Sequence, residues 1–266
     1  MKKLLLTVFA AAAFAACSSD DDPDNDTASE NNFLPLTTGN YWTYNVTGGG
    51  ITSRDSLYVE GDTVVDGNNY KQMKTLLPLA TGFFSQSLRN NAIRKVNSSL
   101  IIHGNAGFNL GGAIPIEINL DDFVIFRENA QANDELSNVD GTIEQEVGGY
   151  PLQLNYTLTS RAGETFSSYT VPGGETYTDV KSVQITWNLG VSTTWTLAGF
   201  EVDIPIMAPQ DVLVSTNYYA KNVGMIYGTT TLSYDLEDFS EADIELPIPP
   251  SANETQQEFL DDFQAD

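Results

Sequence analysis

The sequence predicts an all-β domain, mainly antiparallel, in which a curved sheet forms either a half-barrel or a β-sandwich. Apolar and polar residues alternate over long stretches, most regularly at residues 152–159 and 182–197. Such alternation is typical of antiparallel strands that have one face in water and the other on a core. Short turn sequences separate the stretches, which favours a meander over a βαβ fold.

The folded part is predicted to begin at residue 33. Residues 41–46 form a first strand, in which Trp42, Tyr44 and Val46 share one face because side chains alternate across a strand. Further strands are expected at about 53–60 and 69–77. The turn between them contains Asp66-Gly67, residues that accept the positive φ angles of a tight hairpin.

Residues 78–112 alternate short apolar runs with Asn, Ser and Gly, a pattern that indicates strands joined by loops. The glycine-rich stretch 104–113 has neither a GxGxxG spacing nor a P-loop lysine, so we expect an ordinary flexible loop. Residues 217–236 are predicted to form two strands joined near 222–224. A single β-rich domain thus spans residues 33–236.

The last segment, residues 237–266, is acidic and contains Pro247, Pro249 and Pro250, which break regular elements. It is therefore expected to be a C-terminal tail outside the domain. Within it, residues 253–263 could form a short C-terminal helix, because Asn253 and Gln256 have the spacing of a capping box.

The N-terminus predicts export. Lys2 and Lys3 precede an uncharged run, residues 4–16, that is too short at ~1.5 Å per residue to cross a ~30 Å bilayer core. Residues 1–16 are thus a signal peptide. The sequence Phe-Ala-Ala-Cys at 14–17 resembles a bacterial lipobox, except that Phe14 stands where an aliphatic residue is usual. The resemblance implies cleavage before Cys17 and acylation of its thiol; the alternative is an ordinary secreted protein.

Residues 17–32 are acidic, nearly free of apolar residues and are expected to be a disordered tether. They resemble the acidic export signal of surface lipoproteins of the Bacteroidota. This resemblance implies an outer-membrane lipoprotein exposed at the cell surface, with the periplasmic side of the membrane as the alternative.

The composition excludes several kinds of functional site and partner. Cys17 and His103 are the only cysteine and histidine, so disulfides, thiolate nucleophiles and multi-histidine metal sites are not expected. Without Lys2 and Lys3, ten basic residues face 36 acidic ones. Such a chain is repelled by phosphates, so nucleic acid is not an expected partner, and membrane attachment should depend on the acyl chains.

Three segments carry a family resemblance: residues 33–44, 59–72 and 218–226. Together they resemble a group of mostly uncharacterised Bacteroidota lipoproteins. That group is similar in pattern to the lipoprotein-carrier half-barrels, whose concave face can hold an acyl chain. The similarity implies a binding role, although this chain lacks the long N-terminal helix of those carriers.

Aromatic side chains are the main candidates for ligand contact, because a flat ring can cover a sugar face. The first candidates are Trp187 and Trp195, and further candidates are Trp42, Tyr218 and Tyr219. The alternative is that Trp187 and Trp195 are simply core residues of their strands.

Metal and acid–base sites have less support in the sequence. Asp22, Asp24 and Asp26 have the spacing of the first EF-hand ligands, but Thr27 and Phe33 stand where its glycine and glutamate are needed. The tether is therefore expected to be solvated charge, with weak calcium binding as the alternative. His103 is expected to be structural or exposed rather than a general base. No cofactor is expected.

The first functional hypothesis is a non-enzymatic binding or accessory lipoprotein that holds an apolar or glycan ligand in the curve of its sheet. A carboxylate-based glycan hydrolase is the second, since such chemistry requires only two acids. A structural or adhesin-like partner of an outer-membrane complex is the third. An apolar pocket favours the first, two facing carboxylates favour the second, and a large flat patch favours the third.

Overall fold

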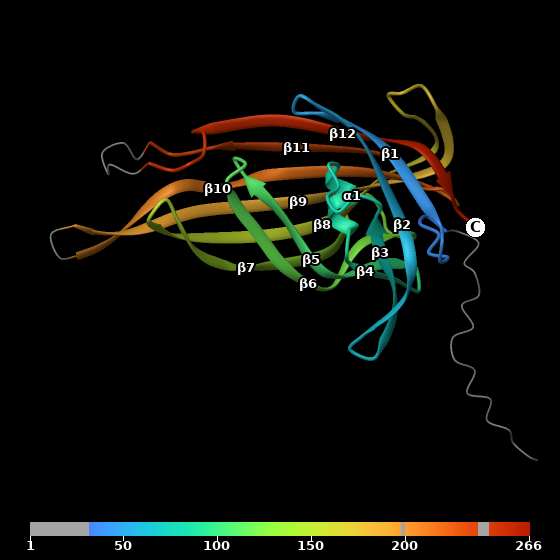
Figure 1. Ribbon diagram of the computed structural model, residues 1–266, viewed down its shortest axis with the longest axis horizontal. Coiled ribbons are helices and arrows are strands. Elements are labelled where there is room, and N and C mark those ends of the chain that lie inside the picture. The colour runs from blue at the N-terminus through green and yellow to red at the C-terminus, as the bar shows by residue number, and fades with distance from the viewer. Residues whose placement is uncertain (1–31, 198–199, 239–244) are drawn as a thin grey trace, which may run out of the picture. The chain divides into compact units, whose positions relative to one another are not determined.

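The computed structural model describes residues 32–197, 200–238 and 245–266, without the side chains of residue 51 and of 195–197, 200 and 201. These residues form one twelve-stranded antiparallel sheet and one short helix, α1 (Phe83–Leu88), shown in Figure 1. The prediction of an all-β fold is confirmed. The predicted signal peptide, Cys17 and nearly all of the tether lie outside the described residues.

The strands are β1 (Tyr41–Gly48), β2 (Ile51–Val65), β3 (Asn68–Thr75), β4 (Ala92–Val96), β5 (Ser99–Leu110), β6 (Ile114–Arg127), β7 (Glu135–Val147), β8 (Tyr150–Thr170), β9 (Thr176–Leu197), β10 (Phe200–Ala220), β11 (Gly224–Asp235) and β12 (Ser251–Gln264). Their order in the sheet is β6-β5-β4-β3-β2-β1-β12-β11-β10-β9-β8-β7. Two six-stranded meanders are therefore joined where the last strand pairs with the first.

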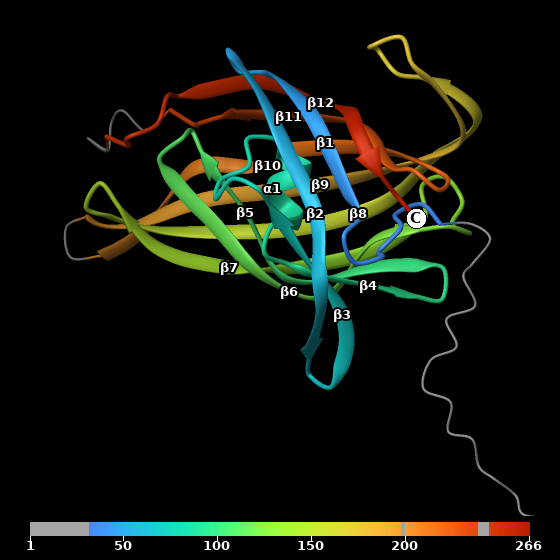
Figure 2. The same cartoon turned by 45° about the vertical axis from the view of Figure 1, so that its right-hand side comes forward.

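The sheet is curved until its two edges, β6 and β7, come close together. Near this seam the Ser160 hydroxyl of β8 donates a hydrogen bond to the Val124 carbonyl of β6. The main chain of Asn133, between β6 and β7, donates to the Ala162 carbonyl of β8 at 2.7 Å. As Figure 2 shows, the nearly closed sheet encloses α1.

The core fills the inside of this curve. Trp42, Tyr44 and Val46 share the inner face of β1 and are completely buried, as their alternation predicted. The same alternation is correct in β8 and β9, where the buried apolar residues include Leu152, Leu154, Leu158, Val183, Trp187 and Leu189. The β2–β3 turn is also as predicted, because Asp66 and Gly67 both have positive φ, 49° and 80°.

Two predictions between residues 78 and 113 are wrong. Residues 83–88 form α1 rather than part of a strand. Their apolar side chains pack inside the curve of the sheet, and their main chain forms a helix instead of pairing with a neighbouring strand. The glycine-rich stretch is no flexible loop either, since residues 104–110 belong to β5. A Cβ on Gly107 would lie 2.3 Å from the Ile116 carbonyl oxygen, so glycine there allows close strand contact.

The C-terminal prediction is wrong as well. Residues 251–264 form β12, which lies between β1 and β11, so the segment is neither a helix nor a tail outside the sheet. Pairing on both edges outweighs the weak helical preference that the capping pattern indicates.

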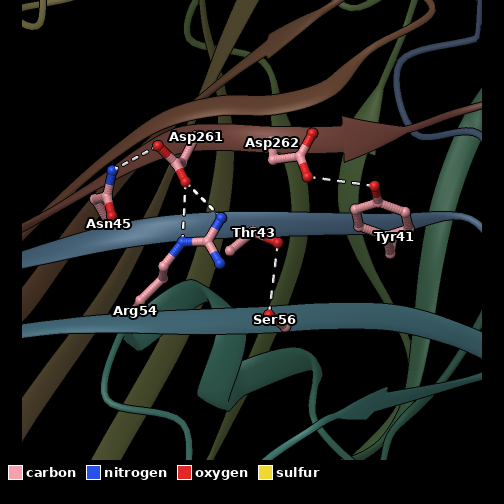
Figure 3. A network of polar contacts seen from close by, with 7 residues as sticks. All are labelled: Tyr41, Thr43, Asn45, Arg54, Ser56, Asp261 and Asp262. Atoms are coloured by element: carbon pink, nitrogen blue, oxygen red, sulfur yellow. Dashed lines mark hydrogen bonds and ion pairs between the residues drawn. The ribbon is translucent and has the colours of Figure 1, made fainter.

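Figure 3 shows how outward side chains join the C-terminal strand to the N-terminal hairpin. Asp261 of β12 accepts hydrogen bonds from Asn45 at 3.0 Å and from Arg54 at 2.5 Å. Tyr41 donates to Asp262 at 3.3 Å. These groups are exposed, so they fix the register of β12 more than they add stability. No helix in the described ranges is long and apolar enough to cross a membrane.

Candidate functional site: an apolar cavity behind the helix

A cavity of about 40 Å³ lies between α1 and the inner face of the sheet. The side chains around it come from α1, β5, β6, β8, β9 and β10, and none of them is a carboxylate. They are Phe83, Phe84, Ser87, Leu88, Ile102, Ala106, Leu120, Phe123, Ile125, Leu158, Ile185, Trp187, Asn217 and Tyr219. A concave apolar site with few polar groups is suited to an apolar ligand.

α1 is held in place by side chains of the sheet. The main-chain N–H groups of Thr81 and Gly82 donate to Asp55 of β2, at 2.9 Å and 2.6 Å. The next N–H group, of Phe83, donates to Gln256 of β12 at 2.8 Å. The N-terminal end of α1 is therefore fixed by acceptors from two central strands.

Glu258 of β12 completes this attachment. Its carboxylate accepts hydrogen bonds from the main-chain N–H groups of Phe84 at 2.6 Å and Ser85 at 3.4 Å, and from the Ser85 hydroxyl at 3.2 Å. Glu258 is 2% exposed. Burial raises its pKa to about 7, although the hydrogen bonds from α1 act in the opposite direction.

The attachment also explains the glycine that precedes the helix. A Cβ on Gly82 would lie 2.1 Å from an oxygen of Glu258. Only glycine lets this main chain approach the buried carboxylate so closely.

Of the predicted aromatic residues, Trp187 and Tyr219 meet at the cavity. Trp187 is 1% exposed and is packed between Phe108 and Tyr156, at centroid distances of 5.4 Å and 6.3 Å. Its ring is covered by other rings, which leaves no open face for a sugar. The side chain of Trp195 lies outside the described residues.

The other two aromatic candidates lie elsewhere. Trp42 is buried and its Nε1 donates to the Val223 carbonyl at 2.5 Å. Tyr218 stacks on Tyr169, with ring centroids 4.5 Å apart, and so joins β10 to the far end of β8. The structure thus does not bring Trp42 and Tyr218 to the cavity.

One polar group at the cavity was missed in the sequence. Asn217 is 2% exposed, and its Oδ1 has no hydrogen-bond partner within the described part of the chain. Such a buried acceptor needs a donor, which a water or a polar group of a ligand can supply. Alternation back from Tyr219 places Asn217 on the inner face and could have identified it.

His103 belongs to a polar cluster on β3–β6, where a bulge sets Asp121 and Asp122 opposite it. His103 Nδ1 lies 3.4 Å from Asp121, and ligand atoms of the three residues lie within 4.8 Å of one another. Asp122 already accepts hydrogen bonds from Tyr70 and from Arg94, which lies 2.6 Å away. The cluster is therefore a hydrogen-bonded network that contains its own cation.

Partial burial acts to raise the pKa of Asp122, but the hydrogen bonds from Tyr70 and Arg94 outweigh it and hold that pKa below its usual value. Burial and the bond to Asp122 raise the pKa of Tyr70 to about 12. Both groups thus keep their ordinary charge at neutral pH, and neither is prepared for proton transfer.

Comparison with known proteins finds one distantly similar structure and no related sequence. No protein-family profile matches the chain, and no curated protein matches it. A crystal structure described as a "putative lipoprotein" from Parabacteroides distasonis ATCC 8503 is similar over 88% of this chain and 99% of its own, at 11% identity and a TM-score of 0.37. The family resemblance of the three sequence segments remains a prediction.

Proposed function

We propose that this protein is a lipoprotein, anchored through Cys17 in the outer membrane and exposed at the cell surface, that binds an apolar ligand without catalysis. The observation that carries the binding role is the partly open apolar cavity behind α1, whose walls hold no carboxylate. An acyl chain is the chemical class that such walls favour, with Asn217 available to one polar group. The covered ring of Trp187 favours this ligand over a glycan.

The size of the cavity adds a condition. At about 40 Å³ it is much smaller than an apolar cavity that binds benzene, which measures about 150 Å³. A larger ligand therefore has to displace α1. The helix suits this role, because it is attached by side-chain acceptors rather than by strand pairing.

The hydrolase alternative loses support from the same contacts. Asp55 and Glu258 are the buried carboxylates nearest to the cavity, and both accept hydrogen bonds from the main chain at the start of α1. They have no access to a substrate while the helix is in place. Glycoside hydrolysis instead requires two carboxyl groups on either side of a sugar bond.

The test is ligand capture followed by a probe-binding assay. Native mass spectrometry of the Cys17→Ala chain, produced in a Bacteroidota host and purified without detergent, should reveal a bound lipid. In vitro, the fluorescent probe N-phenyl-1-naphthylamine should bind the protein. Ala106→Leu places a larger side chain in the cavity and should weaken probe binding about tenfold. Val64→Leu, at an exposed site of β2, should leave probe binding unchanged.

A clean mass together with no probe binding would overturn the proposal. Equal binding by the wild type and Ala106→Leu would do the same, because it would place the probe elsewhere. Thermal melts of each variant show whether a loss of binding reflects a loss of fold.

A further inference from the structure

Three exposed leucines precede α1. Leu76, Leu77 and Leu79 are 73%, 63% and 73% exposed. Single exposed aliphatic residues are normal on a protein surface, but three within four residues concentrate exposed apolar side chains in one short segment. We refer to residues 76–79 as the leucine loop.

Hydrogen bonds hold the leucine loop at both ends, so the fold itself keeps these leucines exposed. At the start, the Leu76 N–H donates to the Ser56 carbonyl at 3.1 Å. At the end, the Ala80 N–H donates to Gln86 at 3.3 Å, and Thr81 is bonded to Asp55. Pro78 further restricts the chain between these points.

The loop lies in the part of the sequence that lacks acidic residues. Residues 67–116 contain five basic residues and none of the 36 acidic residues of the chain. Two of the five, Lys74 and Arg89, adjoin the base of the loop: Lys74 donates to Asn90 at 3.0 Å, and Arg89 donates to Gln86 at 3.1 Å. Across the described ranges, neither forms an ion pair.

We propose that the leucine loop, with Lys74 and Arg89, is a membrane-contact surface that inserts its leucines into a bilayer containing anionic lipids. Apolar side chains beside cations match the acyl chains and phosphates of such a bilayer. The acidic character of the whole chain argues against membrane contact only if the charge is uniform, and along the sequence it is not. Lys71, Arg94 and Lys95 pair with acidic residues from outside the stretch, whereas Lys74 and Arg89 beside the loop form no such ion pair in the described ranges.

The proposed lipid anchor on Cys17 favours a bilayer over a soluble protein as the partner of the leucine loop. Fourteen residues separate Cys17 from Asn32, a distance of roughly 50 Å at full extension. A lipidated Cys17 would therefore keep the bilayer within reach, and weak insertion would then suffice. The inference goes beyond the proposed ligand binding and does not depend on it.

The experiment uses the mature chain with Cys17→Ala, so that no acyl chain contributes. Co-sedimentation with vesicles of phosphatidylcholine and phosphatidylglycerol in a 7:3 ratio should show binding that weakens with added salt and is lower on pure phosphatidylcholine. Replacing Leu76, Leu77 and Leu79 by serine should weaken binding at least tenfold. The matched control, Val64→Ser at another exposed aliphatic position, should not change it.

Two further variants separate the contributions. Lys74→Gln with Arg89→Gln should remove the preference for phosphatidylglycerol. Leu77→Trp should give fluorescence that brominated lipids quench. The proposal is overturned if the wild type stays in the supernatant, if the triple serine variant sediments equally well, or if the leucines instead mediate self-association in analytical ultracentrifugation without any lipid binding.

Discussion

Glu258 is a buried carboxylate that the fold tolerates because α1 supplies its hydrogen bonds. Its pKa is raised to about 7 by burial, against an ordinary value of 4.5. The folded protein therefore binds this proton more tightly than the unfolded chain does. The stability that Glu258 contributes is fully present below pH 4.5 and is lost as the pH rises through about 7.

Glu258→Gln should remove this dependence. Relative to the wild type, the variant should gain stability between pH 4.5 and 8, on the order of 3 kcal/mol, because glutamine has no proton to lose. Any change in hydrogen-bond geometry adds an offset that does not vary with pH. Urea unfolding at several pH values measures the difference, and Glu254→Gln, at an exposed site of β12, should show no such trend. A pH-independent difference for Glu258→Gln would contradict the assigned pKa.

Gly224 begins β11 with a φ of 119° and lies against Trp42. A Cβ there would lie 2.4 Å from the Trp42 Nε1, whose hydrogen bond to the Val223 carbonyl joins β1 to the β10–β11 turn. Glycine is therefore needed for both its backbone angle and its lack of a side chain.

Gly224→Ala should destabilise the protein by about 3 kcal/mol, since backbone strain and overpacking add together. Gly67→Ala is the matched control, because Gly67 also has positive φ but has nothing within 4 Å of an added Cβ. It should cost about 1 kcal/mol. Chemical denaturation of both variants measures the two costs, and equal losses would show that the contact with Trp42 is unimportant.

At the scale of elements, α1 differs from every strand because no main-chain pairing with the sheet holds its first turn. Gln256 accepts from the Phe83 N–H at 2.8 Å and donates to the Thr81 carbonyl at 3.0 Å, so a single side chain fixes both sides of this turn. Segments attached in this way are expected at the low end of local stability.

Gln256→Ala should loosen α1 and leave the sheet intact. Hydrogen exchange at residues 81–88 should accelerate at least tenfold, while exchange in β8 and β9 stays unchanged. Association of the naphthylamine probe should also become faster, because the helix covers the cavity. Uniform acceleration across the sheet would show instead that α1 is an integral part of the core.

β12 has the opposite character, since it pairs with β1 and β11 along most of its length. A chain that ends at residue 250 would leave both neighbours as unpaired edges and would remove Leu260 and Glu258 from the interior.

This truncation should abolish folding. The expected result is loss of the cooperative thermal transition and recovery of the protein as aggregate. A chain that ends at Gln264 loses the hydrogen bonds of Asp266 with Thr37, Asn40 and Gln264 and the packing of Ala265, and it should fold because β12 itself is kept. If a protein that ends at residue 250 is soluble and melts cooperatively, residues 251–266 are not needed for folding and the prediction is wrong.

At the scale of the whole molecule, the proposed anchor decides where the domain acts. Cys17→Ala should abolish palmitate labelling and move the protein from the membrane to the soluble fraction. Persistent labelling would contradict the lipobox. Protease added to intact cells should remove the domain from the wild type, and full protection would place it on the periplasmic side.

Much of the fold could be predicted from the sequence. The alternation that buries Trp42, Tyr44 and Val46 is local, and so is the Asp66-Gly67 turn, because each depends on residues close together in the chain. The same alternation placed Trp187 on the apolar face of β9.

The sequence by itself thus determined the all-β class and the inner faces of several strands, since these depend on local pattern, whereas the export signal stays a prediction. Only the tertiary structure decided that residues 251–264 are a strand, that residues 83–88 are a helix and that Glu258 is buried. Each depends on contacts between distant parts of the chain: β12 forms because β1 and β11 present two unpaired edges, and Glu258 is 173 residues from the Ser85 that it binds. Local preference is weak beside such pairing and burial. Alternation places Trp187 and Asn217 on the inner face, but no local pattern could have indicated that α1 packs against them to form the cavity.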